Sequence, residues 1–94
     1  MLEYLKSKIL EELADALDYM TKALETKGHP CSSKFYAISM DETKHAGALT
    51  KTFSSIEKPA TVTDAEFAKM YKDILDAYTS SMGKFEEMKK LYWK

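Results

Sequence analysis

Three ionisable residues have the types and the spacing expected of ligands for a transition metal. Glu42 and His45 are three residues apart, a Glu-x-x-His pattern that places both side chains on one face of a helix. Glu12 lies thirty residues before Glu42. Carboxylate oxygens with one imidazole nitrogen suit iron or manganese, and a carboxylate can bridge two ions. Glu12, Glu42 and His45 are therefore candidates both for metal binding and for catalysis.

The chain is expected to position these residues on helices. Its long stretches between glycine and proline are rich in Leu, Ala, Glu, Lys and Met, which all favour helix. Gly28-His29-Pro30 and Lys58-Pro59 mark two breaks. Within one domain of residues 1–94 we predict three helices, at about residues 2–27, 32–56 and 64–92. The fold class is therefore all-α.

The breaks also indicate how the helices begin and how two of them are arranged. Ser32 or Ser33 is the expected cap of the second helix, and Thr63-Asp64-Ala65-Glu66 is a capping box that opens the third. Because only a short connection joins the first two helices, we expect them to form an antiparallel hairpin.

Each predicted helix has one apolar stripe on a helical wheel, with the spacing of three and four that is typical of a bundle. In the first helix the stripe comprises Leu2, Leu5, Ile9, Leu13, Ala16, Met20 and Leu24. In the second it comprises Phe35, Ile38, Leu49, Phe53 and Ile56. In the third it comprises Phe67, Met70, Tyr71, Ile74, Tyr78, Ser81, Phe85, Met88 and Tyr92.

Glu42 and His45 interrupt the stripe of the second helix. Both lie within about 40° of its centre on the wheel. A carboxylate on a buried face destabilises the fold unless a positive charge compensates it. No Lys or Arg occupies the middle of any stripe, since Lys6 and Lys89 touch them only near the ends. We therefore expect a metal ion to supply the charge.

The first helix supplies the second carboxylate. Glu12 lies at the edge of its stripe, about 80° from the centre, whereas Glu11 points about 180° away. Tyr19 shares this edge two turns further along. Folding the hairpin about residue 28 or 29 places position 12 opposite position 45. Glu12, Glu42 and His45 should therefore meet at one level of the bundle.

One chain nevertheless holds only half of a di-metal site. A di-iron bundle uses four Glu and two His, with one Glu-x-x-His on each of two helices. The third helix does not provide the missing half, because Glu86 and Glu87 point away from its stripe and the other histidine, His29, lies in the turn. We therefore expect a second copy of the chain to complete the site, in a twofold dimer.

These features resemble the ferritin-like superfamily, and most of all the encapsulated ferritins, which are half-ferritins. The resemblance rests on Glu11-Glu12-Leu13-Ala14-Asp15-Ala16-Leu17-Asp18-Tyr19, on Asp41-Glu42-Thr43-Lys44-His45-Ala46 and on the offset between them. Rubrerythrins share the same half-motif. The resemblance implies a four-helix ferritin-like bundle that is completed by dimerisation, as a homodimer or a larger ring.

By this resemblance, Glu42 would bridge two irons, Glu12 would be a terminal or chelating ligand, and His45 would bind iron through one ring nitrogen. Tyr19 would lie behind the ligands, hydrogen-bonded to one of their carboxylates. The implied activity is that of a ferroxidase-type oxidoreductase, which oxidises Fe(II) to Fe(III) for storage inside an encapsulin compartment. Manganese is the alternative metal.

Two features depart from the encapsulated ferritins. The chain ends Leu91-Tyr92-Trp93-Lys94, with no extension like the C-terminal targeting peptide of that family, so we expect either that association with a shell is absent or that the tail is not part of this chain. The third helix is also long and aromatic for a half-ferritin. We expect it either to hold the dimer together or to build a different oligomer.

Composition narrows the remaining choices. A net charge of −1 gives no electrostatic case for a nucleic-acid partner, and no apolar run approaches a membrane span. With a single cysteine, Cys31, and no signal-peptide pattern, we expect a cytoplasmic protein. Two other interpretations stay open: a di-metal protein that reduces peroxide and stores no iron, and a helical interaction module whose polar cluster binds no metal.

Overall fold

Three helices account for most of the chain. The computed structural model describes all 94 residues. It contains α1 (Leu2–Glu25), α2 (Ser32–Ser55) and α3 (Asp64–Tyr92). The predicted all-α class is confirmed, and every helix boundary lies within two residues of its predicted position.

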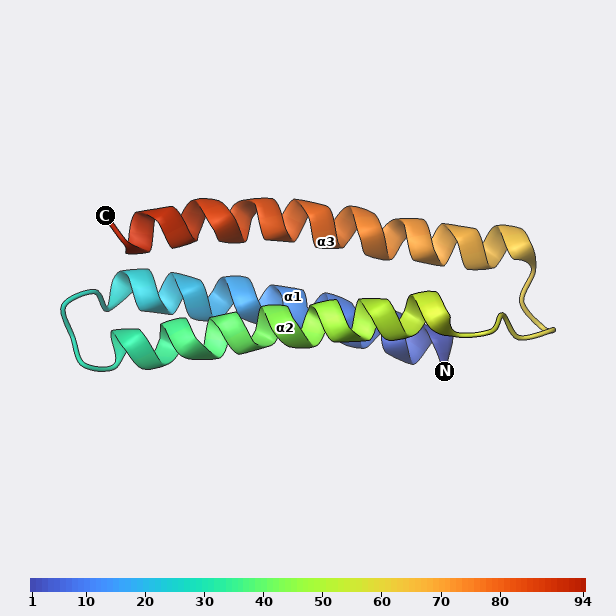
Figure 1. The fold of residues 1–94 in the computed structure, drawn as a ribbon, viewed down its shortest axis with the longest axis horizontal. Coiled ribbons are helices and arrows are strands. Elements are labelled where there is room, and N and C mark those ends of the chain that lie inside the picture. The colour runs from blue at the N-terminus through green and yellow to red at the C-terminus, as the bar shows by residue number, and fades with distance from the viewer.

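The helices lie side by side along one axis, in a body of 53 × 18 × 15 Å (Figure 1). α1 and α3 run in the same direction, and α2 runs antiparallel to both. α1 packs extensively against α2 and also against α3, whereas α2 and α3 touch each other little. None of the helices combines the length and the apolar character that a membrane span requires.

A tight turn joins α1 to α2, and the predicted antiparallel hairpin is confirmed. Gly28 has a φ of +92°, a left-handed conformation that glycine adopts without strain. The Ser32 hydroxyl donates a hydrogen bond of 2.7 Å to the Ala23 carbonyl and so ties the two helix ends together. The expected serine cap is wrong, because the N-cap residue is Cys31 and no side chain caps the helix.

α2 faces α1 with smaller side chains than its predicted stripe contains. Four of its five buried residues recur every seven positions and form the seam, namely Ser32, Ser39, Ala46 and Phe53, and the fifth is Thr43. Of the predicted stripe only Phe53 is fully buried, while Ile38 is 39% exposed. Small side chains on α2 leave room for the larger apolar residues of α1, whose predicted stripe is buried except for the half-buried Leu24.

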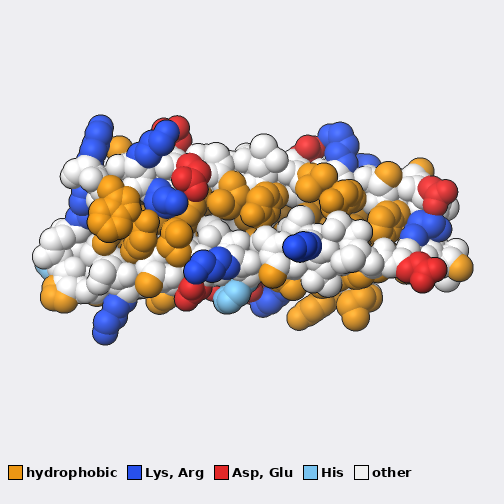
Figure 2. All heavy atoms as spheres, in the orientation of Figure 1, with side chains coloured by type: hydrophobic (Ala, Val, Ile, Leu, Met, Phe, Trp, Pro, Cys, Tyr) orange, Lys and Arg blue, Asp and Glu red, His pale blue; other side chains and the backbone are white.

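α3 begins at the predicted capping box. The Thr63 side chain accepts from the Glu66 N–H, and the Glu66 side chain accepts from the Thr63 N–H, both at 3.1 Å. Its predicted stripe faces the hairpin, with Ile74 and Phe85 buried and the other members half-buried. Figure 2 shows hydrophobic side chains in a band along the boundary between α3 and α2. This boundary is therefore less completely closed than the one between α1 and α2.

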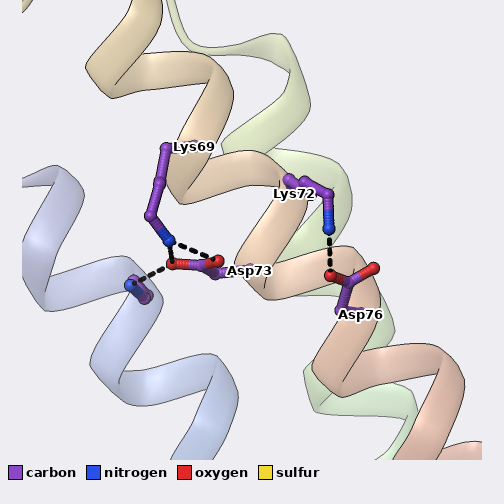
Figure 3. Close-up of polar contacts among 5 residues, drawn as sticks. Lys69, Lys72, Asp73 and Asp76 are labelled. Atoms are coloured by element: carbon purple, nitrogen blue, oxygen red, sulfur yellow. Dashed lines mark hydrogen bonds and ion pairs between the residues drawn. The ribbon is translucent and has the colours of Figure 1, made fainter.

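An ion-pair network holds the first half of α3 against α1. The Asp73 carboxylate accepts hydrogen bonds from Lys69 in α3 at 3.1 Å and from Lys6 in α1 at 3.2 Å. Figure 3 shows this network beside a separate pair within α3, Lys72 with Asp76, at 2.7 Å. Lys6 is thus the residue that connects this network in α3 to α1.

An aromatic cluster holds the other end of α3 against α2. The Trp93 indole N–H donates a hydrogen bond of 3.0 Å to the Tyr36 hydroxyl. The Tyr92 ring stacks on that of Tyr36 with a centroid separation of 4.5 Å. The two ends of α3 are therefore held by separate sets of contacts. The candidate site lies on the hairpin that α1 and α2 form.

Candidate metal centre

The structure brings the three predicted ligands together on one side of the hairpin. His45 Nδ1 lies 3.5 Å from Glu12 Oε2 and 3.7 Å from Glu42 Oε1. One ligand atom from each of the three residues lies within 4.8 Å of the other two. The spacing of three aligns Glu42 with His45 on α2, and the register of the hairpin brings Glu12 level with them. That these residues bind a metal stays a prediction.

Glu12 carries an unusual oxygen atom. The residue is only 8% exposed, and its Oε2 is buried without a hydrogen-bond partner. The His45 nitrogen at 3.5 Å is further away than the usual range of about 2.7–3.2 Å for an N–H···O bond. A buried acceptor without a donor costs about 1–3 kcal/mol, and more when it is charged. This oxygen would therefore gain stability from a proton or a cation.

Lys8 supplies a positive charge that the sequence analysis missed. Its Nζ lies 3.6 Å from Glu12 Oε1 and 3.5 Å from Glu11 Oε1. Lys8 lies off the apolar stripe, but its long side chain reaches the residue one turn further along α1. The expectation that no lysine compensates these carboxylates is therefore wrong for Glu12. The spacing of four between Lys8 and Glu12 was the signal that could have revealed the pair.

Glu42 has no lysine partner, and its carboxyl keeps a proton to a higher pH than usual. The adjacent Glu12 carboxylate favours the protonated form of Glu42 and raises its pKa to about 7, and burial and the Glu12 and Asp15 charges act in the same direction. The protonated carboxyl of Glu42 in turn lowers the pKa of Glu12, with help from Lys8 and His45. Near neutral pH the Glu12 carboxyl is thus ionised, whereas the Glu42 carboxyl is protonated in only part of the molecules.

The site opens to solvent at His45. The His45 side chain is 60% exposed, compared with 17% for Glu42 and 11% for Glu12. The expectation that His45 lies on a buried face is wrong for the single chain, because α1 packs on the neighbouring seam of α2 that contains Ser39 and Ala46. This side of the hairpin is therefore only partly covered.

Tyr19 contributes packing on the same side of the hairpin. It is half-buried, and its ring stacks on that of Phe35 with a centroid separation of 6.3 Å. No hydrogen bond joins its hydroxyl to Glu12 Oε2, which has no hydrogen-bond partner. The hydrogen bond that the family resemblance implies for Tyr19 is therefore not made at this oxygen within the single chain.

No other part of the chain gathers a comparable set of ligands. Glu12, Glu42 and His45 are the only group of three or more His, Cys, Asp or Glu residues that converge in this way. His29 and Cys31 lie exposed at the turn. A surface hollow of about 420 Å³ lies elsewhere, between α1 and α3, where Lys6 and Asp73 line it. The hollow has no part in the candidate site.

The three ligand atoms are arranged closely enough to share one ion. Ligands bound at about 2.1 Å, at tetrahedral or octahedral angles, are roughly 3.0–3.4 Å apart. The separations of His45 from the two carboxylates, 3.5 and 3.7 Å, exceed this range only slightly, and all three ligand atoms lie within 4.8 Å of one another, so side-chain rotations would bring them around one ion. Two carboxylates and one imidazole suit Fe(II) or Mn(II), and three ligands leave coordination positions open.

Comparisons with known proteins do not identify a function for this site. No family model matches the sequence, and neither the curated proteins nor the solved structures include a match. What the site can do must therefore be argued from the unpartnered Glu12 oxygen and from the side chains around it.

Proposed function

We propose that the chain binds Fe(II) or Mn(II) through Glu12, Glu42 and His45. The observation that carries this proposal is the buried Glu12 Oε2, which has no hydrogen-bond partner and lies 3.5 Å from His45 Nδ1. A cation between these atoms would satisfy the oxygen and replace the proton that Glu42 binds near neutral pH. One ion would thus compensate both the unpartnered Glu12 oxygen and the charge of the Glu42 carboxylate.

A second copy of the chain would complete a di-metal centre. One chain offers two carboxylates and one imidazole, half of the set that a di-iron bundle uses. Ile38, 39% exposed, lies two turns before His45 on the same face of α2. Twofold pairing of this face would cover Ile38, bring two half-sites together and form a four-helix ferritin-like bundle from two hairpins.

The activity that we propose for this centre is the oxidation of Fe(II) to Fe(III), as the ferritin-like resemblance implies. Bound iron would supply the electrons for the reduction of dioxygen or peroxide. The two carboxylates stabilise the higher charge of Fe(III), because hard oxygen ligands favour it. His45 is the most exposed of the three ligands, and an ion would therefore reach it first from solvent.

The direct test combines native mass with metal analysis. We expect about one metal ion per chain in an even-numbered oligomer, with a di-iron site shared between two chains. Glu42→Ala and His45→Ala should each weaken Mn(II) binding by roughly a hundredfold, since even the partners behind a ligand contribute 10- to 100-fold. Glu57→Ala and His29→Ala remove the same groups at exposed positions and should change nothing. Unaltered Fe(II) oxidation in the first pair of variants would refute the assignment.

A metal-free interaction module is the second candidate, and Lys8 is the observation that favours it. Lys8 already pairs with Glu12, and a proton on Glu42 would leave the cluster close to neutral without any ion. Under this alternative, a chelator should alter neither the melting temperature nor the oligomer size. Under the first proposal, Mn(II) at a hundred times its Kd should stabilise the fold by about 2.7 kcal/mol.

A further inference from the structure

Lys8 lies between two neighbouring carboxylates that have very different surroundings. Its Nζ is 3.6 Å from Glu12 Oε1, in the candidate site, and 3.5 Å from Glu11 Oε1, at the surface. The side chains of Glu12 and Glu11 are 11% and 60% exposed. We propose that Lys8 is a displaceable counterion, which neutralises Glu12 before metal binds and so sets the metal affinity. This inference rests on the proposed function of the site.

The contacts of Lys8 favour displacement over a permanent bond. A lysine four residues before a glutamate on a helix is the weaker of the two orientations of such a pair. Both distances are long for a charge-assisted hydrogen bond, which is usually about 2.7–2.9 Å. The Lys8 side chain is also 37% exposed, so it can move without crossing packed atoms. Lys8 therefore holds Glu12 only loosely.

Glu11 gives Lys8 a second partner when Glu12 takes a metal ion. A divalent cation bound to Glu12 would repel the ammonium group only a few ångströms away. Rotation of the side chain towards Glu11 relieves this repulsion and keeps Lys8 paired. The adjacent Glu11-Glu12 pair thus has two distinct tasks, since Glu12 binds the ion and Glu11 receives the lysine that the ion displaces.

The test is the Mn(II) affinity of Lys8→Gln, measured by calorimetry in the whole protein. Because the ammonium group of Lys8 competes with a doubly charged ion for the Glu12 carboxylate, Lys8→Gln should bind Mn(II) roughly 3- to 10-fold more tightly. The gain should shrink at about 1 M salt, where exposed charges are screened within a few ångströms.

Lys22→Gln is the matched control for this experiment. Lys22 lies on the same helix, pairs with Glu25 at 3.9 Å and is likewise partly exposed. It is ten residues from Glu12, about 15 Å along the helix axis. Its replacement removes the same charge, and the Mn(II) affinity should stay the same. An equal gain in both variants would indicate a general charge effect and would overturn the role of Lys8.

Glu11→Gln tests the second partner. In the wild-type background it should weaken Mn(II) binding about two- to threefold, the effect of one exposed pair. In the Lys8→Gln background this loss should be smaller, because no displaced lysine needs the carboxylate. If wild type binds Mn(II) and Lys8→Gln has unchanged or weaker affinity, the inference fails alone. If neither protein binds Mn(II), the proposed function fails as well.

Discussion

His45 Nδ1 and Glu12 Oε2 face each other across the interface of α1 and α2 at 3.5 Å. The separation is too long for a strong hydrogen bond, yet it is close to that of two ligands on one metal ion. The oxygen is buried, while the histidine is open to solvent. This pair therefore joins the interior of the hairpin to its surface, and a metal ion bound here would compete with the proton of the neighbouring Glu42.

We first predict that the metal-free protein loses stability as the pH rises from about 4.5 to 7. The pKa of Glu42 is about 7 in the folded chain, against a reference value of 4.5. Within this window the folded chain binds more protons than the unfolded chain, so unfolding becomes easier as the pH rises, and the loss is complete above pH 7. Glu12, whose pKa is lowered, acts in the opposite direction and only below pH 4.5.

Urea unfolding in the presence of a chelator, at several pH values, measures this dependence. Glu42→Gln carries a neutral amide at every pH and should remove most of the slope. Glu57→Gln, at an exposed position, should keep it. An identical slope in wild type and Glu42→Gln would show that Glu42 is not the group responsible.

The second prediction is that Mn(II) binding is linked to the same proton. Because the ion must displace the proton on Glu42, the Kd should fall about tenfold for each pH unit up to about 7. Above that pH the dependence should flatten. Calorimetry in two buffers of different ionisation enthalpy would count the protons released. Binding that releases no proton at pH 6 would contradict the prediction.

Much of the fold could be predicted because local rules determine it. Gly28 and Thr63-Asp64-Ala65-Glu66 act through backbone conformation and capping, which depend on neighbouring residues only. The level at which Glu12 meets His45 follows from the length of the two helices and of the turn between them. The spacing of three between Glu42 and His45 and the register of the hairpin were therefore sufficient to bring the candidate ligands to one level.

The parts that could not be predicted depend on how side chains fill space. The seam of α2 contains Ser39 and Ala46, which a search for large apolar residues does not select. As a result the true seam lies beside the predicted stripe, and His45 is left exposed. Lys8 was missed for a related reason, since a helical wheel places the backbone position and not the end of a long side chain.

The third prediction concerns two glycines inside helices. Gly83 has open space where a β-carbon would lie, so Gly83→Ala should stabilise α3 by about 0.5–1 kcal/mol. At Gly47 the new methyl group would meet the Tyr78 hydroxyl at 3.3 Å, and Gly47→Ala should therefore gain less. Thermal unfolding compares the two variants. A larger gain at Gly47 would mean that α2 and α3 are further apart than in this structure.

The last prediction concerns the face of α2 that carries the site. Ile38 and Leu75 are each 39% exposed, Ile38 beside the candidate ligands and Leu75 on α3. If two copies pair through the site, Ile38→Gln removes apolar contact from both of them, and the dimer should weaken about tenfold or more. Leu75→Gln makes the same kind of change away from the site, and the dimer should keep its strength. Sedimentation over a range of concentrations, with a melting curve for each variant, measures both effects. Equal weakening would point to a different interface, and equal strength in both variants would leave the half-site without the partner that the proposal requires.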